Sequence, residues 1–412
     1  MTSTPNDATT RASSMTNPAD ALVRTKILLL GLRRSGKTSI QQVLFNNLPP
    51  KECFYLDATM RIVKHAYDTI IPLEIWDCPG NTTVESLGAP LSQFATLIFV
   101  IDIRDLYNQP IAKLVEFIIA AYHDNPNINL EVFVHKAERL HEDDKFENFR
   151  QINERVTDRL MDESQEYEQL QLNFHLTSIH DHSLHEAFSR VLHKLIDSLP
   201  YLEDLLNVFC ANSQSPKAFL FDARSRLYVA TDLSPVDSAT HNLCCDNLAM
   251  LNSFGALYKS VSASPARRRF PSTATPPPSV VSTTPATPVS HSSDIDSEKQ
   301  SDDSHSTPHS PLPSPHPDPP KSKSPSPSDP SPNQARKLPR ERFYPSAATS
   351  LHPATPGTTL TCHMITPELV LLALLPTPVF EGKRGLIDYN VVFFREGVQE
   401  ICSVEREARM GV

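Results

Sequence analysis

Residues that could bind phosphate stand together near the start of the chain, in the run Gly31-Leu32-Arg33-Arg34-Ser35-Gly36-Lys37-Thr38. In this pattern the glycines let successive backbone N–H groups curl around a phosphate, the lysine neutralises phosphate oxygens, and the threonine hydroxyl can bind Mg²⁺. The apolar run 26–30 before the loop predicts a buried strand, and 39–48 behind it is helix-like, so a chance match is a weak alternative. We expect the phosphates of a nucleotide to contact Arg34, Ser35, Gly36, Lys37, Thr38 and Ser39.

A carboxylate and a glycine follow the apolar run 70–77. Asp77 ends this run, and Gly80 stands three residues later. In phosphoryl-transfer proteins a carboxylate at this place holds Mg²⁺ through water, and the glycine N–H senses the γ-phosphate. Between this motif and the phosphate loop, Thr59 is the candidate for a threonine that reaches Mg²⁺ and the γ-phosphate, with Thr69 as the alternative. The predicted magnesium-binding residues are Thr38, Thr59 and Asp77.

A third group of residues could recognise a base. The segment His135-Lys136-Ala137-Glu138 follows an apolar run, and Ile179 follows the next one. An acidic side chain can accept hydrogen bonds from the N1–H and exocyclic amine of guanine, which adenine lacks, and a lysine stem can pack along the base. The Ile179 N–H could donate to the base carbonyl. The predicted base-binding residues are therefore His135, Lys136, Glu138 and Ile179, although His135 alone would be an ordinary loop histidine.

Alternating apolar and amphipathic segments must position these residues. We predict strands at 26–30, 70–77, 96–102, 129–135 and 172–177, and helical segments at 39–48, 111–123, 144–162 and 184–209. This alternation is typical of an α/β fold whose mainly parallel sheet is covered by helices on both faces.

A second module follows, with strands at 217–222 and 226–231, a helix at 236–259, strands at 359–365 and 369–375, and a helix at 386–402. Neither half could bury its apolar face alone, so we expect one α+β domain interrupted by an insertion. The predicted divisions are a disordered lead (1–21), an α/β domain (22–209), the second domain (210–260 plus 359–404) and the insertion (261–358).

The insertion has an unusual composition. Residues 261–358 hold 22 of the 37 prolines and few large apolar side chains, which predicts disorder. The serines and threonines at 264, 275, 284, 287, 307, 310, 314 and 324 precede proline there and could be phosphorylated. A solvated spacer without regulation is the alternative. The insertion carries ten Lys/Arg and eight Asp/Glu, so with −10 for the whole chain the remainder carries −12. Such an acidic remainder argues against nucleic-acid binding.

Cysteine spacing and hydropathy indicate the compartment. The seven cysteines show no repeating spacing, which favours free thiols in a reducing compartment. The N-terminus lacks a signal-peptide core, and no stretch reaches the roughly 18 apolar residues of a membrane span. No lipid-attachment motif is recognisable. We expect a cytoplasmic or nuclear protein that does not insert into a membrane and would need partners to reach one.

Taken together, these motifs resemble those of the Ras-like GTPases. The arginine pair Arg33-Arg34, the Asp-x-Pro-Gly at 77–80 and His135-Lys136 in place of Asn-Lys are similar to the Rag family. Residues 176–189 and 217–222 are similar to its C/D branch and the fungal counterpart. The resemblance covers 24–259 and, more loosely, 359–402.

The resemblance implies a GTPase domain with bound GTP or GDP and Mg²⁺, followed by a roadblock-type, longin-like dimerisation domain. It also implies a heterodimer with a Rag A/B-like subunit, a membrane scaffold complex at the vacuole or lysosome, and a GTPase-activating protein. In such a complex the pair relays amino-acid sufficiency to the TOR kinase complex.

Two residues depart from the family pattern. Asn81 stands where relatives usually have the glutamine that orients the attacking water, so we expect slow hydrolysis. Glu138 stands where aspartate is expected, which bears on guanine affinity and selectivity. A binding-only pseudo-GTPase is therefore an alternative. A metabolic P-loop kinase is disfavoured, because it would need an arginine-bearing lid and no base-reading loop.

Overall fold

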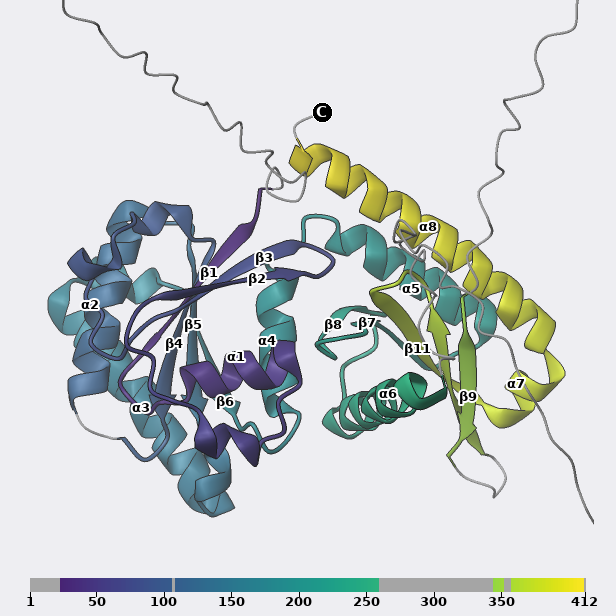
Figure 1. The fold of residues 1–412 in the computed structure, drawn as a ribbon, viewed down its shortest axis with the longest axis horizontal. Coiled ribbons are helices and arrows are strands. Elements are labelled where there is room, and N and C mark those ends of the chain that lie inside the picture. Colours follow the sequence, from purple (N-terminus) through teal and green to yellow (C-terminus); the bar gives the residue numbers. More distant parts are fainter. Residues whose placement is uncertain (1–22, 106–107, 259–343, 352–356, 411–412) are drawn as a thin grey trace, which may run out of the picture. The chain divides into compact units, whose positions relative to one another are not determined.

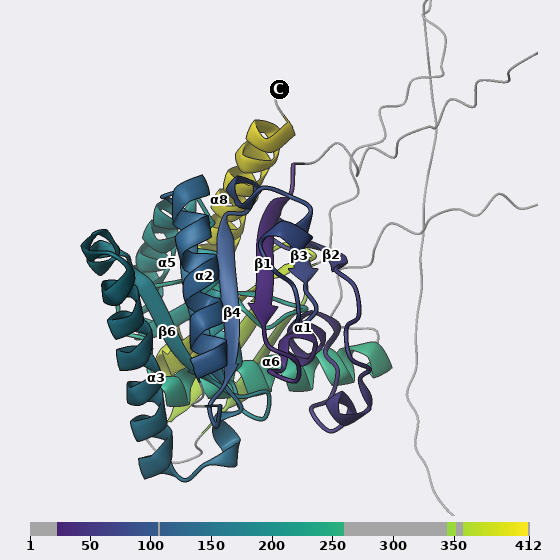
Figure 2. The same ribbon diagram turned by 90° about the vertical axis from the view of Figure 1, so that its left-hand side faces the viewer.

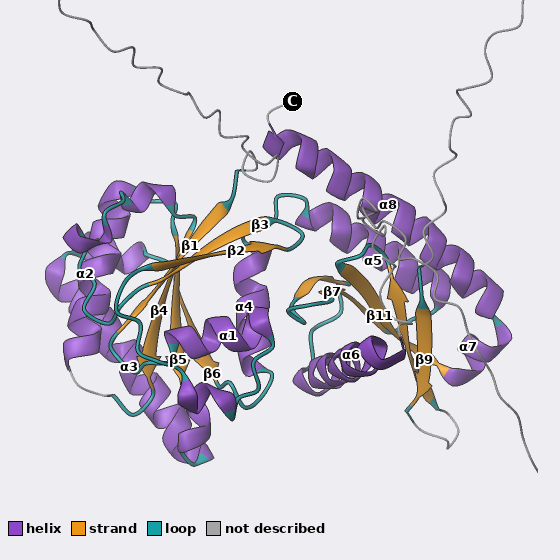
Figure 3. Cartoon of the chain, in the orientation of Figure 1, coloured by secondary structure: helices purple, strands orange, loops and turns teal. Residues whose placement is uncertain are grey.

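The computed structural model describes residues 23–105, 108–258, 344–351 and 357–410. The predicted disorder of 1–21 and of most of 261–358, together with the Ser/Thr-Pro sites named above, lies outside the described residues. The described strands form two separate sheets, one built from residues 25–177 and the other from residues 217–376 (Figures 1 and 3).

The first sheet has six strands in the order β2-β3-β1-β4-β5-β6, and every neighbouring pair except β2–β3 is parallel. The predicted α/β fold with a mainly parallel sheet is thus confirmed. Strands β4 and β5 are buried along nearly their whole length, as expected for a parallel sheet covered on both faces. The strand bounds are β1 (Thr25–Gly31), β2 (Val63–Asp68), β3 (Pro72–Asp77), β4 (Thr96–Asp102), β5 (Asn129–His135) and β6 (Leu172–Thr177).

Helices cover both faces of this sheet (Figure 2). Ile27 and Leu29 of β1 pack toward α1 and α4, whereas Leu28 and Leu30 pack toward α2 and α3. This alternation follows from the two-residue period of a strand. The helix bounds are α1 (Lys37–Asn46), α2 (Asn108–Asp124), α3 (Glu142–Glu163) and α4 (Ser183–His193). The 3₁₀ helices are η2 (Glu52–Tyr55), η3 (Glu85–Leu87), η4 (Leu91–Gln93), η5 (Ala137–Arg139) and η6 (Gln165–Gln169).

The segment 184–209 was predicted as one helical segment, but it forms two helices, so the prediction of a continuous helix was wrong. Helix α4 ends at His193, and α5 (Leu199–Ser213) begins with Pro200 in its first turn. Proline lacks an N–H and is tolerated only where a helix starts, so its position marks the break. Helix α5 packs against α8, where Phe209 and Phe394 lie 5.9 Å apart between ring centroids and Asn390 donates to Ser213. Helix α5, which the sequence analysis placed at the end of the first domain, thus contacts helix α8 of the second module.

The second sheet is antiparallel, in the order β8-β7-β11-β10-β9. Helix α6 packs on one face, and α5 and α8 pack on the other. The predicted α+β character of this module is confirmed. The bounds are β7 (Lys217–Asp222), β8 (Tyr228–Thr231), α6 (Ser238–Tyr258), β9 (Ser346–Ser350), β10 (Thr358–Met364), β11 (Leu369–Pro376), α7 (Thr377–Gly382) and α8 (Arg384–Met410).

Two edge strands were not predicted. Strand β2 alternates between exposed and half-exposed residues, so it lacks a continuous apolar run. Strand β9 lies within the segment expected to be disordered, and its sequence Ser-Ala-Ala-Thr-Ser contains no large apolar side chain. Each pairs on one side only, β2 with β3 and β9 with β10. Both strands are therefore formed by backbone hydrogen bonds to one neighbour, and such pairing leaves no pattern in the hydropathy of the sequence. Among the described helices, none has the length and hydropathy needed to cross a bilayer.

The first sheet brings the predicted site residues to one edge. Strand β1 ends at Gly31, β3 at Asp77, β5 at His135 and β6 at Thr177. Because these strands run parallel, their carboxyl ends lie at the same edge of the sheet, where α/β proteins bind ligands.

Candidate nucleotide-binding site

A cavity of about 750 Å³ is formed by the loops that follow β1, β3, β5 and β6 and by the segment around η2. This volume lies within the ordinary range of small-molecule sites, about 300–1,000 Å³. Most of the residues predicted from sequence line it, and they are Arg34, Gly36, Lys37, Thr38, Ser39, Thr59, Gly80, His135, Lys136, Glu138 and Ile179. Of the remaining three, Ser35 and Asp77 are buried beside the cavity, and Asn81 is exposed outside its lining.

The phosphate loop is tightly curled before α1. Gly36 has φ +109°, and a Cβ atom there would lie 2.6 Å from Cδ2 of His135, so only glycine fits. The buried Lys37 ammonium donates to the carbonyl oxygens of Gly31 at 2.9 Å and Leu32 at 3.0 Å. These hydrogen bonds fix the Lys37 ammonium against the loop, and Lys37 is itself the first residue of α1. A positive side chain and free N–H groups at a helix start together favour an anion.

Three oxygen-bearing side chains converge beside Lys37. Oγ1 of Thr38 lies 2.7 Å from Oδ2 of Asp77 and 2.8 Å from Oγ1 of Thr59, and Oγ1 of Thr59 lies 3.0 Å from the same Asp77 oxygen. The second Asp77 oxygen, Oδ1, is buried and has no hydrogen-bond partner among the described residues. Oxygen ligands of this kind suit a hard cation such as Mg²⁺. The donor set therefore fits the predicted magnesium site.

The alternative threonine lies elsewhere. Thr69 stands in the turn between β2 and β3, and its hydroxyl donates to the carbonyl oxygen of Ile71 at 2.6 Å. It does not join the cluster of Thr38 and Asp77. The geometry favours Thr59.

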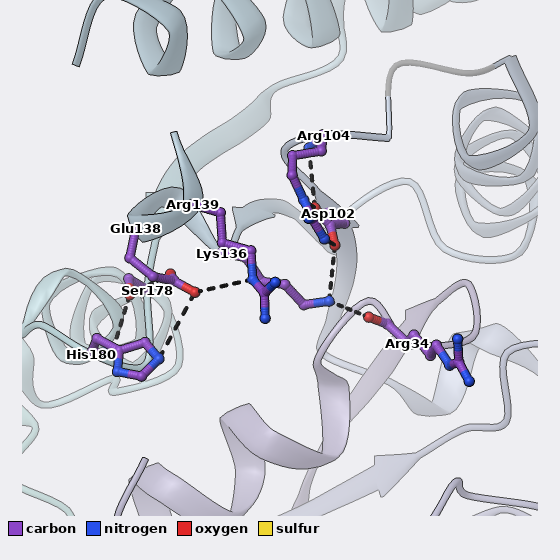
Figure 4. Close-up of polar contacts among 8 residues, drawn as sticks. All are labelled: Arg34, Asp102, Arg104, Lys136, Glu138, Arg139, Ser178 and His180. Carbon is purple, nitrogen blue, oxygen red and sulfur yellow. Dashed lines mark hydrogen bonds and ion pairs between the residues drawn. The ribbon is translucent and has the colours of Figure 1, made fainter. Parts of the chain in front are cut away.

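Lys136 connects the base end of the cavity to the phosphate loop (Figure 4). Its ammonium donates to the Arg34 carbonyl oxygen at 2.5 Å and to Asp102 at 2.9 Å, while Arg104 also donates to Asp102. Burial raises the pKa of Asp102, but hydrogen bonds from Arg104 and Lys136 outweigh it and lower that pKa to about 2. Asp102 therefore stays ionised and keeps the Lys136 stem extended along the cavity wall.

Glu138 is held by neighbours that the sequence analysis did not select. Ser178 donates to one of its oxygens at 2.7 Å, while Arg139 and His180 lie 3.7 Å and 3.9 Å from the other (Figure 4). The Glu138 side chain is one-quarter exposed. A carboxylate so placed can accept hydrogen bonds from two adjacent donors.

His135 is fully buried between the two parts of the site. Its Nδ1 lies 2.9 Å from Oγ1 of Thr177, and its ring packs against Gly36 of the phosphate loop. Burial, with a smaller contribution from the charge of Lys136, lowers the pKa of His135 to about 3. The imidazole is therefore neutral at physiological pH and links β5 and β6 to the phosphate loop.

Sequence reasoning missed part of the lining. Arg33, Lys51, Arg139 and His180 all face the cavity. Arg33, Arg139 and His180 each adjoin a residue that was selected, so extending each motif by one position would have included them. The ion pair between Asp102 and Lys136 could not be predicted from a sequence motif, because the two residues are 34 positions apart in the chain.

Comparison with known proteins identifies the family. A profile described as "Gtr1/RagA G protein conserved region" matches residues 26–248, more than half of the 412 residues. The chain belongs to this G-protein family. GTP-binding protein gtr2 of Schizosaccharomyces pombe is 44% identical over 237 residues, which are 57% of this chain and 75% of that protein. Ras-related GTP-binding protein C of Homo sapiens is 43% identical over 239 residues, which are 57% of this chain but only 59% of the relative.

The branch of this G-protein family follows from a third comparison. GTP-binding protein gtr1 of S. pombe is 26% identical over 231 residues, against 44% for gtr2 of the same organism. The resemblance to the C/D branch and its fungal counterpart is thus confirmed.

Proposed function

We propose that this chain is a guanine-nucleotide-dependent switch that binds GTP or GDP with Mg²⁺. The observation that carries the proposal is the convergence of the Thr38, Thr59 and Asp77 oxygens beside the Lys37 ammonium. When bound, Mg²⁺ would neutralise phosphate charge at these oxygens. Thr59 belongs to the loop that follows η2, and Gly80 belongs to the loop after β3, so both loops can respond to the γ-phosphate.

Guanine selectivity is proposed for the base end of the same cavity. Glu138 would accept from the N1–H and exocyclic amine, Lys136 would cover the base face, and the Ile179 N–H would meet the base carbonyl. Support comes from the lining of the cavity and from the Ser178 hydrogen bond that orients Glu138. An adenine base would leave these groups unpaired, which costs affinity.

Hydrolysis by this site is expected to be slow, because Asn81 is one methylene shorter than glutamine and is exposed outside the cavity lining. The substitution Asn81→Gln is expected to raise the single-turnover rate about 10- to 100-fold, since misplacing a water-positioning group by about 1 Å can cost that much. Single-turnover phosphate release measures this rate. An unchanged rate would contradict a water-positioning role for residue 81.

A binding-only pseudo-GTPase is the second candidate, favoured by the same exposed Asn81. Phosphate release from the GTP-loaded protein, measured with and without an activating protein, separates the two. Release under either condition supports the enzyme. No release under both conditions, with GTP still bound, supports the binding module.

Nucleotide affinity is expected to fall at alkaline pH. Burial lowers the pKa of Lys37 to about 8, with Asp77 opposing this effect. Bound phosphates favour the charged ammonium, so the complex has the higher pKa and holds more protons than the free protein. Affinity for GTP and GDP should therefore fall about tenfold per pH unit above pH 8. Titrations at pH 7, 8 and 9 measure it, with Lys37→Arg as a control whose profile should be flat.

We further propose that the chain acts as one subunit of a heterodimer with a Gtr1/RagA-type subunit, through the second domain. In this role it would be held by a scaffold at the vacuolar or lysosomal membrane and relay amino-acid sufficiency to the TOR kinase complex. Family membership supports this proposal. Co-expression with a Gtr1-type subunit should yield a co-purifying pair that retains guanine nucleotide, whereas a Ras-like GTPase without a second domain should not co-purify. Failure to pair with the Gtr1-type subunit would contradict it.

A further inference from the structure

Gly80 is held from two sides in this structure. On one side it lies against the phosphate loop, where a Cβ atom at Gly80 would be 2.3 Å from the Arg33 nitrogen and 2.9 Å from the Leu32 carbonyl carbon. On the other side the ammonium of Lys113, from helix α2, donates to the Gly80 carbonyl oxygen at 2.9 Å. A residue of helix α2, which carries none of the sequence motifs, thus contacts the loop that follows Asp77.

The residues around Gly80 form a hydrogen-bonded turn. The Thr82 N–H donates to the Pro79 carbonyl oxygen at 3.1 Å, which leaves Gly80 and Asn81 as the two central residues. The Thr82 hydroxyl donates to the same oxygen at 2.9 Å. The peptide between Gly80 and Asn81 is the part of such a turn that can rotate, and type I and type II turns differ mainly in its orientation.

The Lys113 hydrogen bond selects one orientation of this peptide. In a trans peptide the C=O and N–H point in opposite directions, so the Asn81 N–H faces away from Lys113. Rotation of the peptide would break the hydrogen bond and turn an N–H toward an ammonium group. Lys113 is half-buried, and burial lowers its pKa, while Glu116 and Cys78 oppose that effect.

We propose that Lys113 is a positioning residue: by holding the Gly80 carbonyl oxygen it fixes the turn of Gly80 and Asn81, and so keeps the Gly80 N–H in the position required to meet a γ-phosphate. This inference rests on the proposed function and adds a component on helix α2. Lys113 acts through Gly80 and Asn81, so it should affect discrimination between GTP and GDP and the rate of hydrolysis. It should not affect binding of the α- and β-phosphates, which GTP and GDP share.

The test compares Lys113→Met, Lys113→Arg and Glu116→Gln in the full chain. Glu116→Gln is the matched control, because it changes the charge of α2 and leaves the Gly80 contact in place. For each protein, affinities for GDP and for a non-hydrolysable GTP analogue are measured, with single-turnover hydrolysis and amide hydrogen exchange at residues 80–82.

Lys113→Met should weaken binding of the GTP analogue about tenfold, from the loss of one charge-assisted hydrogen bond, and leave GDP affinity within about twofold. Hydrolysis should slow, and exchange at Asn81 and Thr82 should increase. Lys113→Arg should restore all three properties, and Glu116→Gln should behave as the native chain.

Equal weakening of GDP and GTP-analogue binding by Lys113→Met would overturn the inference, as would unchanged exchange at Asn81 and Thr82. If Lys113→Met shows no thermal stabilisation by GDP while the native chain does, the variant has lost GDP binding as well, and the positioning role is again overturned. Failure of the native chain to bind either nucleotide would instead refute the proposed function itself.

Discussion

Substitution of Lys37 by alanine is expected to weaken the binding of both GTP and GDP by about 100- to 10,000-fold. The Lys37 ammonium is buried and donates to two carbonyl oxygens of the loop. The lysine side chain is therefore already ordered at the loop, and phosphate oxygens can take the place of these two acceptors. Two hydrogen bonds from a charged group contribute about 3–6 kcal/mol, and each 1.4 kcal/mol is tenfold in affinity. Calorimetric titration with GDP and with a GTP analogue measures the loss.

The control for this substitution is Lys26→Ala. Lys26 donates to Gln93 at an exposed position and does not line the cavity, so its loss removes the same charge from the chain without touching the site. Its affinities should stay within about twofold of native, as for most surface changes. If Lys37→Ala also stays within that range, the loop formed by residues 31–38 does not bind phosphate.

Substitution of Gly80 by alanine should affect the two nucleotides differently. The added Cβ would lie 2.3 Å and 2.6 Å from the nitrogen and Cα of Arg33, closer than real contacts allow, so the turn must move away from the phosphate loop. The Gly80 N–H would then lie too far from a γ-phosphate to donate to it. GDP has no γ-phosphate, so its binding does not depend on this contact. We expect the ratio of GTP-analogue to GDP affinity to fall roughly tenfold to hundredfold, and hydrolysis to slow with it.

Gly382→Ala is the matched control, because a Cβ atom at Gly382 would meet no heavy atom within 4 Å. Both affinities of that variant should equal those of the native chain. Competition binding with GDP and the GTP analogue gives the ratio directly. A parallel decrease for both nucleotides in Gly80→Ala would contradict a γ-phosphate-sensing role and indicate general damage to the cavity.

The fold was predictable where burial is continuous. The strands at 96–102 and 129–135 have the same bounds in the structure as in the sequence analysis, because central parallel strands are apolar along their length. The bounds of 172–177 also agree, although β6 is a half-buried edge strand, because Leu172, Phe174 and Leu176 alternate along it. Edge strands β2 and β9 were missed, since they are defined by backbone pairing with one neighbour. The break between α4 and α5 was also missed, because the apolar residues on both sides share one helical period.

The site was predictable to the extent that its residues are contiguous in sequence. The phosphate loop and the segment 135–138 each carry several functional residues in one short run, so a single motif locates them. Contacts between distant elements could not be predicted. Lys113 is 33 residues from Gly80, and Ser178 is 40 residues from Glu138, so only the folded chain shows that they meet.

The central claim is that a guanine nucleotide occupies the cavity formed by the loops after β1, β3, β5 and β6. Its most direct test is an equilibrium titration of the purified chain with GTP, GDP and ATP in millimolar Mg²⁺. We predict saturable binding of GTP and GDP at one site, with ATP bound at least about 100-fold more weakly because adenine cannot satisfy Glu138. Absence of saturable binding of both guanine nucleotides, or equal affinity for ATP, would contradict the account.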